Sequence, residues 1–110
     1  MILFVNNSQR KGTCYYEFYK GKWDNRTFWR DDSIFLHDDL MYKAECFELA
    51  LIEVVNFNAF GQTEITLSQW RKIGEIVLDK DITSQEVYKE TDIWVQKVFK
   101  EYECFTILGL

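Results

Sequence analysis

The chain has 110 residues, of which 47% are hydrophobic and 17% aromatic, so we expect one folded domain over residues 1–110 and exclude a disordered chain. Its 18 acidic and 13 basic residues give a net charge of −5, which disfavours direct binding to nucleic acid, because affinity for phosphate depends on Lys and Arg. A macromolecular partner is therefore expected to be a protein, and a basic protein is the natural complement of this charge.

The N-terminal third of the chain predicts strands. Residues 1–5 are a short apolar run, and residues 13–20 are rich in aromatic side chains, which favour a pleated surface. Gly21 marks a turn and residues 23–29 predict a returning strand, so we expect an N-terminal hairpin. Alternation along residues 13–20 puts successive side chains on opposite faces. One face carries Cys14, Tyr16 and Phe18, and the other carries Tyr15, Glu17 and Tyr19.

Residues 33–56 predict a long and mostly buried helix. Its apolar side chains recur at steps of three and four residues, at Leu40, Ala44, Phe47, Leu51 and Val54. We expect Asp31, Asp32 or Ser33 to cap its start, because short polar side chains and negative charge favour a helix N-terminus. In the alternative interpretation residues 33–37 form a strand, and Asp38 or Asp39 is the cap.

The second half of the chain predicts two further helices and a final strand. Two capping boxes, in which a Thr is followed three residues later by Gln or Glu, predict helices over about 67–78 and 84–102. The two pairs are Thr66 with Gln69 and Thr83 with Glu86. The closing residues 104–108 are an unbroken apolar run, which is typical of a buried strand.

These elements predict an α+β fold. Strands gather near the start of the sequence and helices near its end, in the order β-β-β-α-α-α-β. We expect a mainly antiparallel sheet that contains the N-terminal hairpin and the C-terminal strand, with three helices packed on one face. No proline, repeat or flexible linker interrupts the sequence, so no domain boundary is expected.

The sequence carries no recognisable catalytic or cofactor-binding motif, so no catalytic, cofactor-binding or metal-binding residue is assigned. It lacks the glycine-rich phosphate loops and the nucleophile elbow. The single histidine, His37, excludes a multi-histidine metal site and is interpreted as a surface or helix-cap residue. Asp38 and Asp39 follow it without the spacing of a calcium loop, and we interpret the acidic residues here as helix-flanking groups or as an acidic recognition surface.

The three cysteines are consistent with a cytoplasmic protein. Cys14, Cys46 and Cys104 are odd in number and have no paired spacing, so we expect reduced and mostly buried thiols. The opening apolar run is too short for a signal peptide, and no run is long enough to cross a bilayer.

One local region has the composition of a binding surface for single-stranded nucleic acid. Residues 10–30 interleave basic side chains with aromatic ones, such as Tyr15, Tyr19 and Phe28. Alternation buries half of these rings in any strand, and the chain as a whole is acidic. The same residue types dominate protein interfaces, and we therefore favour a protein partner for this region.

The second half of the chain contains segments that resemble small bacterial proteins, among them the immunity proteins of polymorphic and contact-dependent growth inhibition toxin systems. The segments are Phe57–Thr66, Trp70 and Phe105–Leu110. This resemblance implies a small, acidic, cytoplasmic protein without a cofactor, which binds a cognate toxin domain and covers its active site or blocks access of the substrate. Toxins of this kind are often basic nucleases. The resemblance lies in turn and core residues and assigns no binding residue.

The side chains themselves suggest where a partner would bind. Acidic residues would steer a basic partner, and large aromatic side chains would anchor it. The acidic candidates are Asp24, Asp31, Asp32, Asp38, Asp39, Glu45 and Glu53, and the aromatic candidates are Tyr19, Trp23 and Trp29. The alternatives are another protein-binding inhibitor, such as a phage-encoded anti-defence protein or an adaptor, and, with less support, a small enzyme or a metal-binding protein.

Overall fold

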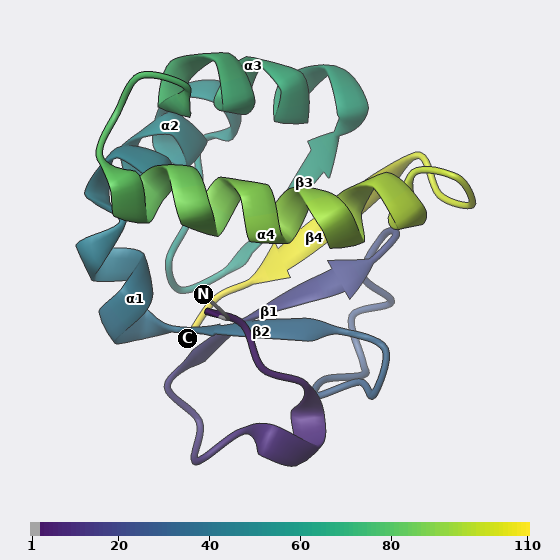
Figure 1. The fold of residues 1–110 in the computed structure, drawn as a ribbon. Helices are drawn as coiled ribbons and strands as arrows, with labels where there is room; N and C mark the ends of the chain where they lie inside the picture. The colour runs from purple at the N-terminus through teal and green to yellow at the C-terminus, as the bar shows by residue number, and fades with distance from the viewer. Residues whose placement is uncertain (1–2) are drawn as a thin grey trace.

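The computed structural model describes residues 3–110, which form a four-stranded antiparallel sheet covered by helices on one face (Figure 1). The strands lie in the order β2-β1-β4-β3, so the C-terminal strand is inserted at the centre beside β1. Their bounds are β1 Tyr15–Lys20, β2 Ile34–His37, β3 Gln62–Thr66 and β4 Cys104–Leu108. This arrangement confirms the α+β fold, the N-terminal hairpin and the buried C-terminal strand.

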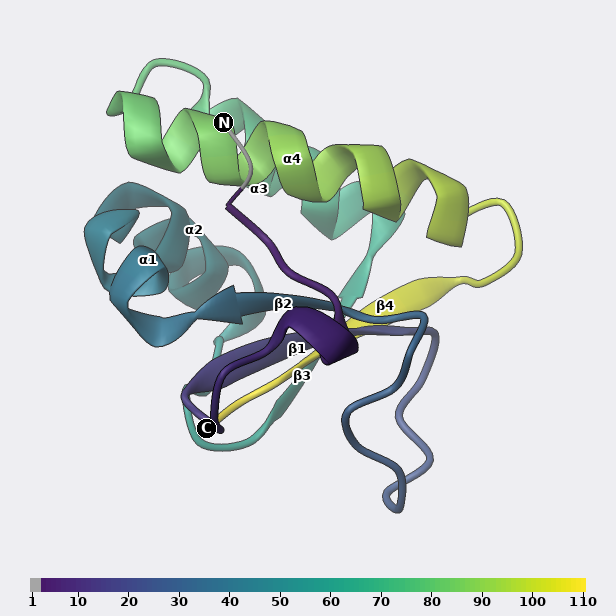
Figure 2. The same ribbon diagram turned by 60° about the horizontal axis from the view of Figure 1, so that its bottom comes forward.

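Four α-helices and one short 3-10 helix accompany the sheet. They are η1 Asn7–Gln9, α1 Asp38–Lys43, α2 Glu45–Val55, α3 Leu67–Val77 and α4 Ile82–Val98. Helices α2, α3 and α4 lie over one face, while α1 lies at the end of β2 (Figure 2). The core between the layers is aromatic, with the Phe105 ring 5.5 Å from Trp70 and 6.2 Å from Phe18. Burial of such rings is the main contribution to stability in a domain of this size.

The returning strand of the hairpin is β2, and the prediction of residues 23–29 as that strand is wrong. Residues 21–33 form a loop in which Asn25 and Trp29 have φ values of 65° and 57°. A residue whose backbone dihedral angles lie in this left-handed region cannot continue an extended strand. The strand begins at Ile34, whose partner in β1 is Phe18, and the pairing continues to His37 opposite Tyr15.

The prediction of one helix over residues 33–56 is also wrong. In the alternative interpretation, the strand is confirmed over Ile34–His37, but the cap at Asp38 or Asp39 is wrong. The chain leaves β2 and enters α1 at once, and Ala44, with ψ of 54°, separates α1 from α2. The cap of α1 is His37, whose Nδ1 accepts a hydrogen bond from the Asp39 backbone N–H at 3.1 Å. Both helices bury their apolar side against the same core. The apolar spacing therefore continues across Ala44 and does not reveal the break between the helices.

Strand β3 is absent from the sequence prediction, because it is only five residues long and four of these residues are polar. Only Thr63 and Ile65 are buried, and they alternate with exposed neighbours. The strand pairs with β4 along its whole length, from Gln62 opposite Leu108 to Thr66 opposite Cys104. Pairing with an apolar neighbour thus stabilises a segment that has little strand signal of its own.

Of the two predicted helix caps in the second half of the chain, Thr66 is confirmed and Thr83 is wrong. The capping box of Thr66 and Gln69 opens α3 as predicted. Helix α4 begins earlier than predicted, at Ile82, because the side chain of Asp81 accepts the Ser84 N–H at 3.0 Å. The predicted strand 1–5 falls partly outside the described residues, and its last residue, Val5, forms an isolated antiparallel bridge to Phe35.

Candidate partner-binding surface

The loop over residues 21–33 connects β1 to β2 and extends from the end of these strands on the side of the sheet away from the helices (Figure 2). The buried carboxylate of Glu17, which is only 2% exposed, holds this loop in place. It accepts hydrogen bonds from the N–H groups of Trp29 at 2.7 Å and Arg30 at 3.0 Å, and from the Ser33 hydroxyl at 2.7 Å. These three bonds replace the hydration that the carboxylate lost on burial and keep Trp29 in its left-handed conformation.

The predicted aromatic anchors of this region are mostly engaged within the protein. Tyr19 is buried, with 4% exposed, so it is not available to a partner at the surface. Trp29 is half-buried between the Arg10 guanidinium, 3.8 Å from its ring, and the Phe35 ring at 5.8 Å. Four of the rings proposed as stacking platforms for nucleic acid are likewise buried and closed to bases. They are Tyr15, Tyr16, Phe18 and Tyr19.

Trp23 and a residue that the anchor prediction missed, Phe28, form the accessible part of the loop. Their rings pack 5.2 Å apart, and Phe28 is 54% exposed. Together they form one wall of an apolar groove of about 380 Å³, which is otherwise lined by Phe60, Gln62 and the chain around Leu108 to Leu110. No sequence signal separates Phe28 from the other aromatic residues of this region, because the loop conformation alone exposes it.

Two of the three acidic residues of the loop, Asp24 and Asp32, are engaged by donors within the loop. Asp24 accepts the N–H groups of Arg26 and Thr27, both at 2.9 Å, and the Thr27 hydroxyl. The hydrogen bonds from the Thr27 and Arg26 backbone lower the pKa of Asp24 below its ordinary 3.8. Asp32 forms an ion pair with Arg30 at 3.3 Å, and across residues 21–33 three acidic side chains balance three basic ones. The loop therefore presents an apolar groove with little net charge.

Helices α1 and α2 concentrate the negative charge of the chain. Residues 38–55 contain five of the 18 acidic residues and one of the 13 basic residues, a local charge of −4. All other residues together contain 13 acidic and 12 basic side chains, so their charges almost cancel. Residues 38–55 are therefore the most acidic helical segment of the chain, and the predicted residues Asp38, Asp39, Glu45 and Glu53 belong to it.

The exposed side of α2 combines these acids with apolar side chains. At 100° per residue, Glu45, Glu48, Leu49, Ile52 and Glu53 fall within an arc of about 140°, opposite the buried side of the helix. Leu49 is 54% exposed and Ile52 45% exposed. The buried side faces the core with Phe47, Ala50 and Leu51. The prediction that Glu45 and Glu53 are exposed is confirmed. Glu48 is half-buried at the edge of this side, and we call these five residues the α2 outer face.

The carboxylates near this face repel one another. Burial raises the pKa of Glu48 above its ordinary 4.5, and the neighbouring charge of Glu45 raises it further. Burial also raises the pKa of Tyr16, with smaller contributions from the charges of Glu48 and Asp38. Within residues 3–110, no Lys, Arg or His lies within 4.0 Å of the three carboxylates of the α2 outer face. A cation supplied by a partner would relieve this repulsion.

The predicted acidic residues thus fall into two groups that lie at opposite ends of β2. Asp31 and Asp32 precede this strand, and Asp38 and Asp39 follow it. A four-residue strand spans about 13 Å, so the two groups do not form one contiguous patch. Glu53 lies further on, near the end of α2, where it belongs to the second group.

The cluster of His37, Asp38 and Asp39 is arranged as a helix cap. Its ligand atoms lie within 4.8 Å of one another, with His37 Nδ1 3.4 Å from Asp38 and 3.6 Å from Asp39. The Nδ1 lone pair that could bind a metal already accepts the Asp39 N–H. The helix-cap interpretation of His37 is confirmed, and the cluster directs two carboxylates toward the N-terminal end of α1, where negative charge is favourable.

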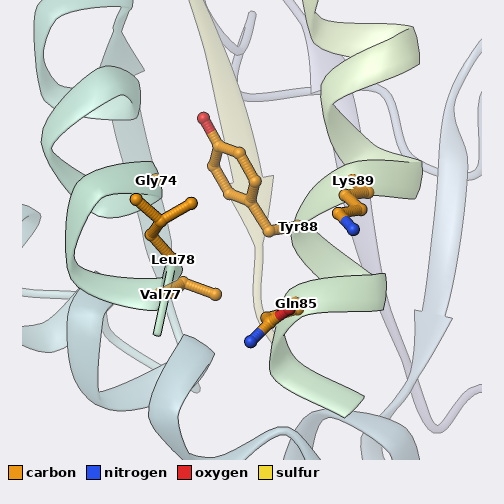
Figure 3. Close-up of a pocket in the computed structure, with 6 residues that line it drawn as sticks. All are labelled: Gly74, Val77, Leu78, Gln85, Tyr88 and Lys89. Atoms are coloured by element: carbon orange, nitrogen blue, oxygen red, sulfur yellow. The ribbon is translucent and has the colours of Figure 1, made fainter. Parts of the chain in front are cut away.

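A small apolar hollow lies between α3 and α4, and Figure 3 shows the six residues that line it. One of them, Tyr88, stacks on Trp70 with 4.4 Å between ring centroids. Gly74 allows this packing, since a β-carbon there would lie 2.3 Å from the Tyr88 hydroxyl. Burial raises the pKa of Tyr88 to about 12, so its hydroxyl stays protonated at neutral pH. The hollow therefore offers apolar contacts and no group that titrates near neutral pH.

The cysteines are free, but the prediction that they are mostly buried is wrong. Cys14 is exposed, and Cys46 and Cys104 are half-buried. A hydrogen bond with Asp81 raises the pKa of Cys46, and burial raises that of Cys104, so both thiols are poor nucleophiles at neutral pH. In the part of the chain that the structure describes, no helix has the length and apolarity needed to cross a membrane.

Comparisons with known proteins add no family assignment to this geometry. No protein-family model matches the chain, and neither the curated proteins nor the solved structures contain a significant match.

Proposed function

We propose that this chain is a toxin-neutralising immunity protein, which acts by binding a basic, nuclease-type toxin domain in the cytoplasm. The observation that supports this proposal is the concentration of net charge on α1 and α2, where residues 38–55 have a charge of −4. A surface of this kind attracts a basic partner over a Debye length, about 8 Å at physiological salt. The sequence resemblance to immunity proteins agrees with this use of the surface.

Inhibition by such a surface requires no reaction. A toxin that cleaves nucleic acid needs a basic cleft for its polyanionic substrate, and an acidic surface competes for the same cations. The carboxylates set the association rate and the orientation, while exposed apolar side chains slow dissociation once they are buried. The bound chain then covers the cleft or blocks the path of the substrate. In this proposal the chain needs no cofactor.

The functional test uses the toxin candidate that genome organisation supplies. Immunity genes lie beside the genes of their toxins, so the C-terminal domain encoded immediately upstream is the partner to express. We expect its induction to stop growth of the host cells and co-expression of this chain to restore growth. Normal growth without this chain, or arrest that persists when the folded chain is present, would contradict the proposal.

A kinetic test then locates the charge that steers association. Two double variants remove two negative charges each, and only their positions differ. Glu45→Gln with Glu53→Gln changes the α2 outer face, and Asp31→Asn with Asp32→Asn, the matched control, changes the loop. We expect the first pair to slow association with the toxin domain severalfold at low salt and the second to change it little. Equal slowing by both pairs would show that net charge alone matters and would remove the role of this surface.

A further inference from the structure

The α2 outer face has an apolar centre and an acidic edge, and a binding partner must complement both. Its centre is apolar, because Leu49 and Ile52 lie one turn apart and are about half-exposed. Carboxylates lie around this centre, with Glu45 toward the start of the helix and Glu48 and Glu53 on its two flanks. An isolated aliphatic side chain on a surface is ordinary, but a pair framed by three unpaired acids is a patterned surface.

We propose that the α2 outer face is the docking site for a basic amphipathic helix of the partner protein. This inference rests on the proposed function, since it names the element of the partner that the acidic surface receives. Charge complementarity selects the occupant: Lys or Arg on both flanks of the partner helix would meet Glu48 and Glu53. Two apolar side chains one turn apart on that helix would cover Leu49 and Ile52.

The dimensions of α2 limit the length of this partner element. An 11-residue helix is about 16 Å long, so three turns of the partner suffice to cover it. Helices that pack in this way lie about 8–10 Å apart, a distance that aliphatic side chains such as Leu49 and Ile52 can fill. Lys43, the single cation of residues 38–55, precedes the start of α2, so the face itself remains free of positive charge.

The carboxylates on this face give the site a preference for cations. Glu48 is half-buried beside Glu45, and a partner cation would stabilise both carboxylates in a partly desolvated setting. The acids of the loop over residues 21–33 lack this preference, because backbone N–H groups or Arg30 already satisfy Asp24 and Asp32. The groove beside Trp23 and Phe28 is apolar but carries no charge pattern that selects an occupant.

The test uses a synthetic probe, so that it does not depend on the toxin. The probe is a helical peptide of about 14 residues with two Leu one turn apart and Lys on both flanks. Its control has the same composition in a scrambled order that spreads the Leu residues around the helix. In ¹⁵N-resolved NMR titrations of the full chain, we expect the probe to shift the amide signals of α2 with a Kd of about 1 mM or tighter, and the scrambled peptide to bind several times more weakly.

Variants of the chain separate the apolar part of the site from its charge. Leu49→Ala with Ile52→Ala should weaken binding of the probe about tenfold at unchanged net charge. The matched control, Leu78→Ala with Ile82→Ala, removes two exposed aliphatic side chains from the turn between α3 and α4 and should leave binding unchanged. Glu45→Gln with Glu53→Gln should weaken binding at low salt and reduce its dependence on salt.

Several outcomes would overturn this inference. They are an absence of shifts in α2, shifts centred on the loop over residues 21–33, equal losses in the two apolar double variants, or concentration-dependent shifts of α2 without peptide. The last outcome would assign the face to a second copy of the chain. Binding of the probe at α2 by a chain that neutralises no toxin would uphold the docking site and reject only the proposed function. Neutralisation in which the toxin leaves α2 unprotected would reject only the docking site.

Discussion

The loop over residues 21–33 and the α2 outer face both carry predicted binding residues, but the surroundings of their carboxylates differ. Glu17 in β1, which anchors the loop, and Asp24 within the loop each accept three hydrogen bonds, so their carboxylates serve the fold. On α2, Glu45, Glu48 and Glu53 have no cation beside them within residues 3–110. An acidic residue in a sequence can therefore hold a loop together or remain available to a partner, and its hydrogen-bond partners decide which.

The largest effect is expected at Glu17. The substitution Glu17→Ala leaves two partly buried backbone N–H groups and one buried hydroxyl without their acceptor, and should lower the free energy of unfolding by about 3 kcal/mol. Urea denaturation followed by tryptophan fluorescence measures this change. The control is Glu64→Ala, which removes an exposed carboxylate from the same sheet face and should change stability by less than about 0.5 kcal/mol. Similar losses in the two variants would remove the distinction between an anchoring acid and a free one.

A smaller loss is expected at Asp24, and it should depend on pH. Because hydrogen bonding lowers the folded-state pKa of Asp24 below 3.8, the carboxylate stabilises the loop above that pH. This stabilisation disappears as the pH falls through the folded-state pKa. Asp24→Ala should therefore lower the melting temperature at neutral pH, and the difference from the native chain should vanish in acid.

Asp31→Ala is the control for the Asp24 experiment. Asp31 lies in the same loop, but its carboxylate accepts only one long hydrogen bond, from the Asn7 side chain at 3.4 Å. The melting temperature of this variant should stay close to that of the native chain at every pH. A loss at Asp31 as large as that at Asp24 would show that loop charge, rather than hydrogen bonding, sets the stability.

The smallest effect is expected at Glu48, with the opposite sign. Because burial and Glu45 raise the folded-state pKa of Glu48 above 4.5, its ionised form destabilises the fold at neutral pH. Glu48→Gln should therefore stabilise the chain at pH 7, by no more than about 0.5 kcal/mol, and this gain should disappear as the pH falls below 4.5. Glu53→Gln, at the more exposed flank of the same face, should be neutral. Destabilisation by Glu48→Gln would mean that this acid also supports the fold.

These signs bear on how the protein could use its surface. An ionised residue that destabilises the folded chain does not serve the fold. Such residues are common at binding sites, where function is favoured over stability. The α2 outer face is therefore a better candidate than the loop for the charged contact. The loop contributes a groove formed by Trp23 and Phe28, whose conformation is set before any partner arrives because Glu17 and Asp24 hold its backbone.

The amino-acid sequence by itself determined the layers of this fold and the identity of much of its core. Helical spacing places Leu67, Trp70, Ile73 and Val77 on one side of α3, because one face of an amphipathic helix must be covered, and the last three are buried. The apolar run at 104–108 predicted a buried strand, because such a run must be covered, and only the structure shows that this strand is central. The net charge also predicted a basic partner, which remains a proposal.

Only the tertiary structure decided where the chain changes direction and which side chains remain accessible. Residues 33–56 have one continuous apolar period, and pairing of Ile34–His37 with β1 decided that the segment is a strand followed by two helices. Strand β3 forms because its backbone pairs with the free edge of β4. Likewise, the acceptor role of Glu17 and the exposure of Phe28 depend on contacts between residues more than ten positions apart, which local periodicity does not encode.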